Sequence, residues 1–336
     1  MPVSYEIRAQ DGLVIARYTG EVTVAQVMSC FRAFQADPGF FYGLTHLVDV
    51  AQVHSAEAGF AEIFALFSTY SRTYAAAGQG SIHLPFLLGG AVSPLTMAGS
   101  VAQGLAESLA SCALTQLVRP GAPAILASFF SSMSLRSGSP TFGTPEPAIG
   151  SLVMGQLARR LNLPLRCAGN FSTSKLPDGQ AMQQSMMSMM SAIQGGANYV
   201  LHSAGFLDGL LSMSYEKMVM DMDMCGALHA YLDGMEVNDD TLGFDALAEL
   251  GPGQHLFSTQ HTLRHYETAY WESTLNDDQP WETWSEKGAF DSALRANLQW
   301  KKTLAEYEAP AMDEGIDEAL QDFVARRKGA IPDMWY

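Results

Sequence analysis

The sequence is short of cysteine, of basic residues and of long apolar runs, and each shortage excludes a class of protein. Its four cysteines lie far apart, with neither a CxxC pair nor a His/Cys spacing typical of zinc. They are Cys30, Cys112, Cys167 and Cys225. We therefore expect reduced thiols in a cytoplasmic protein, without a disulfide framework and without a metal held by this chain.

Basic residues are scarce as well. Only 19 Lys and Arg stand against 35 Asp and Glu, which gives a formal net charge of -16 at pH 7. Because binding of phosphate needs clustered Lys and Arg, nucleic acid and anionic membrane surfaces are excluded as expected partners. The acidity lies mostly from Asp208 onward, and we interpret it as a solvated surface.

No run approaches the roughly 18 apolar residues of a membrane span, and the first residues lack the charged and apolar segments of a signal peptide. What is present describes an ordinary globular protein, because 48% of the 336 residues are hydrophobic and 16% are charged. A chain of this length can bury at least one sizeable core, and two domains are expected.

The first 79 residues are predicted to form a small α/β domain. Apolar and polar residues alternate from Val3 to Gln10, which is typical of a half-buried strand, and Asp11-Gly12 turns the chain into a second strand. The expected elements are a hairpin with strands at 3–10 and 13–18, a helix opened by the capping box Thr23-Val-Ala-Gln26, a strand at 44–50 and a helix around 60–67. The small-residue stretch at 75–81 is the expected boundary.

This order of hairpin, helix, strand and helix, with Asp49 at the end of the third strand, resembles the STAS family. The resemblance implies a phosphorylatable serine at the start of the helix after that strand, and Ser55 is the nearest candidate. The segment between Asp49 and Ser55 lacks the usual motif of the family, so a passive helix cap is the preferred interpretation of Ser55.

Residues 81–235 alternate between strand and helix patterns. Strands are expected near residues 85, 126, 167 and 201, each followed by a helix, which makes four βα units. In parallel α/β folds ligands bind at the carboxyl ends of the strands, where the loops after the third and fourth strands would meet. The polar side chains there are Asn170, Ser172, Thr173, Ser174, Lys175 and His202. The alternatives are that Asn170 and the serines only cap the next helix and that His202 is a structural histidine.

Six separate segments between about residue 83 and the C-terminus resemble the trimethylamine methyltransferase family. They are Arg119-Pro-Gly-Ala-Pro123, Ser137-Gly-Ser-Pro-Thr-Phe-Gly-Thr-Pro-Glu146, Asn170-Phe-Ser-Thr-Ser-Lys-Leu-Pro-Asp-Gly-Gln180, Gly195-Gly-Ala-Asn-Tyr-Val-Leu-His-Ser-Ala-Gly205, Gly251-Pro-Gly-Gln-His255 and His261-Thr-Leu263. The resemblance implies a TIM-barrel enzyme that passes a methyl group from a methylamine or a quaternary amine to cobalt. That cobalt belongs to a corrinoid carried by a separate corrinoid protein.

A closed TIM barrel has eight strands, and only four are expected here. We therefore predict an α/β protein in which a small STAS-like α/β domain at 1–79 precedes a partial TIM-type barrel at 81–336. The partial barrel has four parallel strands and a helical C-terminal extension. Because four strands leave two unpaired edges that invite pairing with another chain, a homo-oligomer is expected.

The resemblance also bears on the substrate. Some members of the family carry a pyrrolysine in the loop that here spans Phe171–Lys175, most closely at Ser174, and only ordinary residues stand there. Members without pyrrolysine act on quaternary amines such as glycine betaine, so the resemblance implies a betaine-type substrate.

Candidate site residues combine this placement with the chemistry of such a ligand. Aromatic faces can bind a quaternary ammonium, and basic or imidazole side chains can bind a carboxylate. The catalytic candidates are His202, Ser174 and Asn170, and the substrate-binding candidates are Phe129, Arg136, Phe171, Lys175, Tyr199, Phe206, Tyr215 and Glu216. Two other interpretations stay open, namely a non-catalytic interaction protein that keeps half of the barrel and an unstable product of gene fusion.

Overall fold

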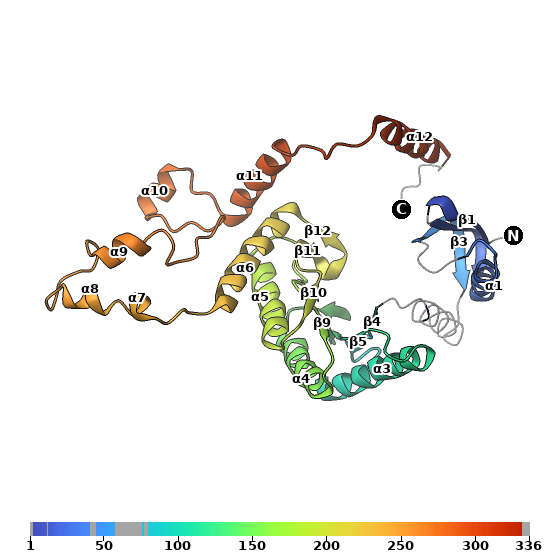
Figure 1. The fold of residues 1–336 in the computed structure, drawn as a ribbon, viewed down its shortest axis with the longest axis horizontal. Helices are drawn as coiled ribbons and strands as arrows, with labels where there is room; N and C mark the ends of the chain where they lie inside the picture. Colours follow the sequence, from blue (N-terminus) through green and yellow to red (C-terminus); the bar gives the residue numbers. More distant parts are fainter. Residues whose placement is uncertain (1–2, 12, 41–44, 58–75, 77–79, 331–336) are drawn as a thin grey trace. The chain divides into compact units, whose positions relative to one another are not determined.

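A computed structural model describes residues 3–11, 13–40, 45–57, 76 and 80–330 (Figure 1). The chain divides into two compact units, and we describe each by itself. The first unit comprises Met1–His83, Leu109–Ile125 and Tyr307–Tyr336. The second unit comprises Leu84–Ser108 and Leu126–Glu306, and it holds most of the candidate site.

The first unit begins with a three-stranded sheet in the order β1-β2-β3. Strand β1 (Val3–Arg8) and strand β2 (Leu13–Thr23) are antiparallel, and β3 (Thr45–Glu57) is parallel to β2. A 3-10 turn, η1 (Ala9–Asp11), lies between β1 and β2. The predicted hairpin and third strand are thus confirmed, whereas the predicted helix around 60–67 lies outside the described residues.

Helix α1 (Val24–Gln35) starts at the predicted capping box. The Thr23 hydroxyl accepts a hydrogen bond from the Gln26 backbone amide, and the Gln26 side chain accepts one from the Thr23 amide at 2.9 Å. Phe31 and Phe34 of this helix pack against Val14 of β2. These contacts bury one face of the sheet and position the helix.

The third strand is longer than predicted. Its register with β2 continues to the pair Thr23 and Glu57, so Ser55 lies within a strand opposite Glu21. The expectation that Ser55 starts or caps a helix is therefore wrong, because β2 itself extends to Thr23 and supplies a pairing partner that far.

The βα region contains the four predicted strands, two of them broken into pieces. Strand β4 (Ser81–His83) is followed by β5 (Phe86–Gly89), and β6 (Ala124–Ala127) by β7 (Phe129–Ser134). The other two are β9 (Leu165–Ala168) and β10 (Tyr199–Leu201). Pairing is parallel between β5 and β7, between β6 and β9, and between β9 and β10. A short β8 (Ser139–Thr141) runs antiparallel to β7.

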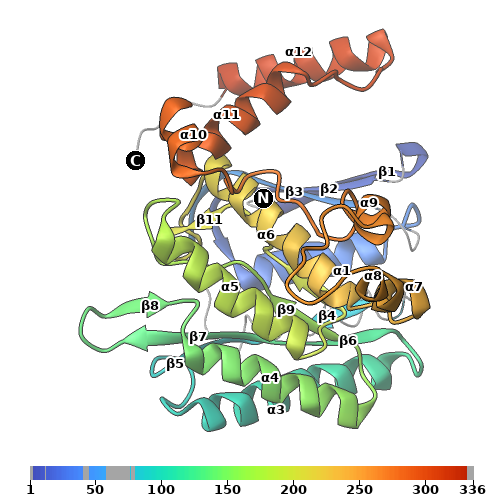
Figure 2. The same cartoon turned by 90° about the vertical axis from the view of Figure 1, so that its left-hand side faces the viewer.

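A helix follows each of these strands, as predicted. They are α3 (Met97–Val118), α4 (Pro145–Leu161), α5 (Gly179–Gln194) and α6 (Tyr215–Asp233). Figure 2 shows α4, α5 and α6 side by side along one face of the sheet. An alternating parallel α/β fold is confirmed, and the sheet, in the order β10-β9-β6-β4, is open with β10 at one edge.

The helices cover one face of this sheet. On that face Leu165 and Cys167 of β9 pack with Met154 of α4 and Ala192 of α5 in the main apolar core. Ala168 of β9 lies on the opposite face, as alternation along a strand requires, and packs with phenylalanines instead. The two faces of the sheet therefore have different surroundings.

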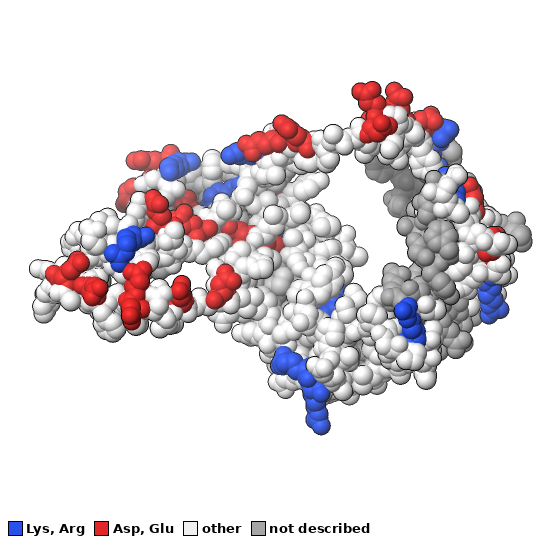
Figure 3. Space-filling model, in the orientation of Figure 1, with Lys and Arg blue, Asp and Glu red and all other residues white. Residues whose placement is uncertain are grey.

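The C-terminal part of the second unit consists of further helices after α6, of which α11 packs against α6. They are α7 (Asp239–Leu242), α8 (Phe244–Ala248), α9 (Gln260–His265), α10 (Trp281–Glu286) and α11 (Ser292–Ala305). Acidic side chains gather over this segment (Figure 3), which fits the predicted solvated acidic surface. A last helix, α12 (Glu314–Ala330), belongs to the first unit. Among the described helices, none combines the length and the apolar character needed to span a bilayer.

Candidate functional site

The loops after β9 and β10 meet, as the sequence predicts. The Gly169 amide donates to the Leu201 carbonyl at 2.9 Å, and the Asn170 amide donates to the His202 carbonyl at 3.0 Å. His202 directly follows β10 with a φ of 61°, a conformation that few residues other than glycine adopt. The backbone thus fixes Asn170 and His202 next to each other.

His202 contacts a buried arginine that the sequence analysis did not name. Nη2 of Arg166 lies 3.2 Å from Nδ1 of His202, and Nη1 donates to the Ser128 carbonyl at 3.4 Å. The Arg166 side chain is only 1% exposed, and the described residues give it no carboxylate partner. Within that part of the chain, Arg166 is therefore a buried cation without a neutralising charge.

This contact fixes the protonation of the imidazole. A guanidinium can only donate, so Nδ1 must be the accepting nitrogen and the neutral ring carries its proton on Nε2. Burial and, after it, the charge of Arg166 lower the pKa of His202. His202 is consequently a neutral hydrogen-bond donor near pH 7.

Phenylalanines surround this imidazole. The ring centroids of Phe206 and Phe171 lie 5.3 and 5.4 Å from that of His202, and Phe129 follows at 6.4 Å. Phe129, Phe142 and Phe171 form a buried cluster with Ala168 and Leu210. The structure thus brings together four candidates, Phe129, Phe171, Phe206 and His202.

The serine loop is held by α5. Ser174 is 5% exposed, and its hydroxyl donates to Asp178 at 2.9 Å, while Asp178 caps α5 by accepting from the Ala181 amide. Hydrogen bonds from that amide and then from Ser174 lower the pKa of Asp178. Ser172 donates to Gln184 of the same helix. This geometry favours the capping role that was the alternative for Ser174.

Asn170 is fully buried. Its Nδ2 donates to the Ser203 carbonyl and lies 3.7 Å from Cys225 Sγ. Its Oδ1 is the only buried side-chain oxygen or nitrogen in the described part of the chain that has no hydrogen-bond partner. A catalytic role for Asn170 stays a prediction.

Three further candidates lie at the protein surface. Lys175 is exposed, and its Nζ pairs with Asp208 at 3.0 Å. Arg136 lies in the exposed turn between β7 and β8. Tyr199 begins β10 and is 45% exposed, whereas His202 follows the other end of that strand. The structure therefore does not bring these three together with the phenylalanine cluster.

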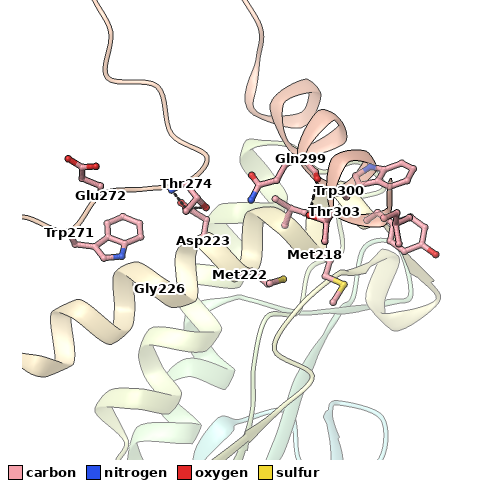
Figure 4. A pocket seen from close by; sticks show the side chains of 13 residues that line it. Met218, Met222, Asp223, Gly226, Trp271, Glu272, Thr274, Gln299, Trp300 and Thr303 are labelled. Atoms are coloured by element: carbon pink, nitrogen blue, oxygen red, sulfur yellow. Dashed lines mark hydrogen bonds between the residues drawn. The ribbon is translucent and has the colours of Figure 1, made fainter. Parts of the chain in front are cut away.

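Tyr215 belongs to a different cavity. A groove of about 530 Å³ runs between α6, the segment around 271–274 and α11, with Trp271 towards one end and Trp300 towards the other (Figure 4). The Tyr215 and Trp300 rings lie 5.0 Å apart. Most of the lining surface is apolar, including Met218 and Met222 of α6.

Glu216 anchors α11 to α6. Its carboxylate accepts hydrogen bonds from Asn297 at 2.6 Å, from Trp300 Nε1 at 2.8 Å and from Ser214 at 2.7 Å. These bonds, that from Ser214 first, lower the pKa of Glu216 to about 2. The geometry supports a structural contact for Glu216, while a role in substrate binding stays a prediction.

The lowered pKa of Glu216 predicts an acid-sensitive contact. Because its folded pKa lies below the usual value of 4.5, the carboxylate stabilises the fold above pH 5 and loses that contribution as the pH falls towards 2. We expect Glu216→Gln to lower the melting temperature at pH 7 but to differ little from the wild type at pH 2.5. Thermal unfolding followed by circular dichroism at both pH values measures this, and an equal effect at both would contradict the assignment.

A buried ion pair supports the loop that carries Phe206. Nζ of Lys217 donates to the Asp221 carboxylate and, at 2.7 Å, to Ser185 of α5. Both charged side chains are fully buried. Asp221 Oδ2 in turn accepts from the Gly205 amide at 2.9 Å, and Gly205 has a φ of 87°. Sequence reasoning missed this pair, although its i, i+4 spacing on a helix is visible in the sequence.

In the described residues, no group of three His, Cys, Asp or Glu side chains comes together as metal ligands.

Comparison with known proteins identifies the family. The model of the family "Trimethylamine methyltransferase (MTTB)" matches residues 65–332. The glycine betaine methyltransferase of Desulfitobacterium hafniense (strain Y51) is 38% identical over 254 residues, which cover 76% of this chain and 53% of that protein. The trimethylamine methyltransferase MttB of D. hafniense (strain DSM 10664 / DCB-2) is 30% identical over 237 residues, 70% of this chain and 47% of that protein.

A relative from Methanosarcina has a lower identity. The trimethylamine methyltransferase MttB2 of Methanosarcina mazei is 28% identical over 250 residues, which cover 74% of this chain and 50% of that protein. The chain thus spans about half the length of the curated relatives that it matches. The family match covers well over half of the sequence, and the chain therefore belongs to the trimethylamine methyltransferase family.

Proposed function

We propose that this protein binds a betaine, a quaternary amine with a carboxylate, and transfers one of its methyl groups to the cobalt of a corrinoid on a partner protein. The observation that carries the proposal is the uncompensated Arg166 guanidinium beside neutral His202, next to a phenylalanine cluster. The similarity to a relative named glycine betaine methyltransferase supports the same substrate class.

The phenylalanine cluster suits the cationic end of such a ligand. The faces of Phe129, Phe171 and Phe206 present the negative part of their quadrupoles, and each desolvated contact with a quaternary ammonium contributes roughly 0.5–2 kcal/mol. The ring centroid of Phe171 lies 5.1 Å from that of Phe129 and 6.3 Å from that of Phe206, so Phe171 is the ring that the other two share as a neighbour. A methylated nitrogen held there is kept away from water.

His202 and Arg166 suit the anionic end. The imidazole offers its Nε2 proton to a carboxylate, and Arg166 keeps the ring in that tautomer by donating to Nδ1. The buried positive charge also attracts an anion more strongly than it would in water. Tertiary amines such as trimethylamine have no carboxylate that could interact with His202 and Arg166.

The corrinoid, when bound with its partner, supplies the cobalt that accepts the methyl group. The residues of this chain then need to hold the nitrogen–methyl bond in line with the acceptor and to exclude water, and no nucleophile of their own is required. Proposed site residues are therefore Phe129, Phe171, Phe206, His202 and Arg166, with Asn170 behind them.

Titration calorimetry on the purified chain tests the ligand class. We expect glycine betaine to bind, and we expect choline, which keeps the quaternary nitrogen but lacks the carboxylate, to bind at least about tenfold more weakly, a loss of about 1.4 kcal/mol. His202→Asn, which keeps a donor and a similar volume, should weaken betaine and leave choline unchanged. Tight trimethylamine binding with no response to betaine would overturn the substrate class.

A second assay tests the transfer. Formation of methylcobalamin from reduced cobalamin can be followed by absorbance with the same panel of amines. Betaine binding without any transfer would favour the alternative, a non-catalytic binding protein.

The finer features of the fold also belong to this proposal. We propose that the four βα units at 81–336 form part of a TIM-type barrel with a helical extension, and that 1–79 is a STAS-like domain. The parallel order of β9 and β10 and their helices support the first statement. The β1–β2 hairpin, α1 and the parallel β3 support the second. A cytoplasmic location is proposed with them.

A further inference from the structure

We infer that the sheet face opposite the helices is an interface between two copies of this chain, which together close one eight-stranded barrel. The inference rests on the partial barrel of the proposed function, but it does not depend on the substrate. It concerns three exposed apolar side chains, Phe86, Tyr199 and Leu201, which we call the open face.

The register shows that these three side chains share one face. Tyr199 and Leu201 of β10 lie opposite Arg166 and Ala168 of β9, while Val200 between them packs into the helix-side core. The first and third residues of β10 therefore point away from the helices.

Phe86 belongs to the same face. It is paired with Phe129 of β7, which packs with Ala168 rather than with the helices. The next residue of β5, Leu87, is 1% exposed in the helix-side core. Between them on the same face, Phe129 and Arg166 are buried, so the exposed part of this face lies at the outer strands β5 and β10.

The apolar side chains of the open face are exposed and need a surface that covers them. Phe86, Tyr199 and Leu201 are 52%, 45% and 37% exposed. All-parallel sheets occur almost only with both faces covered, because their strands are apolar on both sides. Here α3 to α6 cover one face, and in the described part of the chain Phe142 and Phe171 cover only the centre of the other.

A second copy fits this surface for reasons of symmetry. A two-fold axis that runs along the strands keeps all strands of both copies parallel. It places β10 of each copy beside β5 of the other, so the dimer has two equivalent β10–β5 contacts. The contact is self-complementary and closed, and four strands from each copy make the eight of a closed barrel. The curated relatives, of which this chain spans about half, are long enough to contain both halves in one chain.

The charge distribution does not oppose the association of two copies through the open face. Residues 84–214, which include β5 to β10 and α3 to α5, carry four acidic and six basic residues, although the whole chain has a net charge of -16. The acidic excess gathers over α7 to α11 instead (Figure 3). Each copy would then contribute one His202 and one phenylalanine cluster to a common mouth.

Sedimentation velocity on the full chain tests the interface. We expect the wild type to sediment at twice 36.4 kDa. Leu201→Glu should stay folded by circular dichroism but weaken the dimer by more than about 100-fold, because a carboxylate would be buried without a partner. Leu247→Glu on α8, at a site that is 57% exposed, is the matched control and should remain dimeric.

A lysine at Phe86 provides a second variant in case Leu201→Glu does not fold, and where both variants fold their mixture tests the pairing. Leu201 of one copy would lie beside Phe86 of the other, so F86K alone should be monomeric, and a mixture of L201E and F86K chains should form the mixed dimer. A monomeric wild type at 50 μM would overturn the inference, because the chain would then cover its own face. A dimer that persists in both the L201E and the F86K variants would also overturn the inference. A protein that fails to bind betaine would contradict the proposed function but not this interface.

Discussion

Replacing Lys217 with methionine should lower the free energy of unfolding by about 3–5 kcal/mol, because it leaves the buried Asp221 carboxylate without its counter-charge. Both side chains are fully buried, and Asp221 would keep the Gly205 amide as its donor. Urea denaturation followed by circular dichroism at pH 7 measures the change.

Two further variants separate the causes. Lys302→Met removes a lysine on α11 that is 75% exposed and lies 3.9 Å from Glu306, so we expect a change of no more than about 0.5 kcal/mol. The double change K217M/D221L should recover much of the stability, since well-packed apolar residues often replace a buried ion pair without loss. If K217M unfolded at the same urea concentration as K302M, the pair would contribute nothing to stability.

Replacing Arg166 with methionine should weaken glycine betaine by about 100-fold, or about 2.7 kcal/mol, and leave choline unchanged. Methionine keeps the length of the arginine stem but removes the charge and the donor to His202 Nδ1. Calorimetry with both ligands measures the difference, and R166K, which retains the charge, should fall between R166M and the wild type.

The same variant changes the titration of His202. The charge of Arg166 is one of two causes that lower the pKa of His202, so R166M should raise it, while burial still keeps it below its usual value of 6.5. NMR of the imidazole protons follows this shift independently of ligand. A folded R166M with unchanged betaine affinity would show that Arg166 only holds the strand in place.

Much of the fold could be predicted, because it depends on local patterns. The capping box at Thr23, the turn at Asp11 and the alternation of strand and helix from Ser81 onward are written in consecutive residues. The end of β3 could not be, because its last seven residues are strand only through pairing with β2. Tertiary pairing decided that boundary, which local propensity does not encode.

The candidate site was predicted less completely. Their position after a predicted strand indicated His202 and Phe171 as site residues. The same criterion excluded Arg166, because Arg166 lies inside β9. The available signal was a single basic residue in an otherwise apolar strand, between Leu165 and Cys167 of the core. The burial of Lys217 could not be predicted for another reason, because it depends on a contact with Ser185 of a neighbouring helix.

The two loops at the mouth of the sheet are joined by more than one pair of hydrogen bonds. Besides the contact between Asn170 and His202, the Asp208 amide donates to Ser174 and the Gly209 amide to Ser172, both at 2.8 Å. Neither loop can therefore open by itself like a lid, because its motion would break backbone bonds held by the other. The loops after β9 and β10 must therefore open together. Such an opening requires local unfolding of both loops, which is slower than the motion of a free loop.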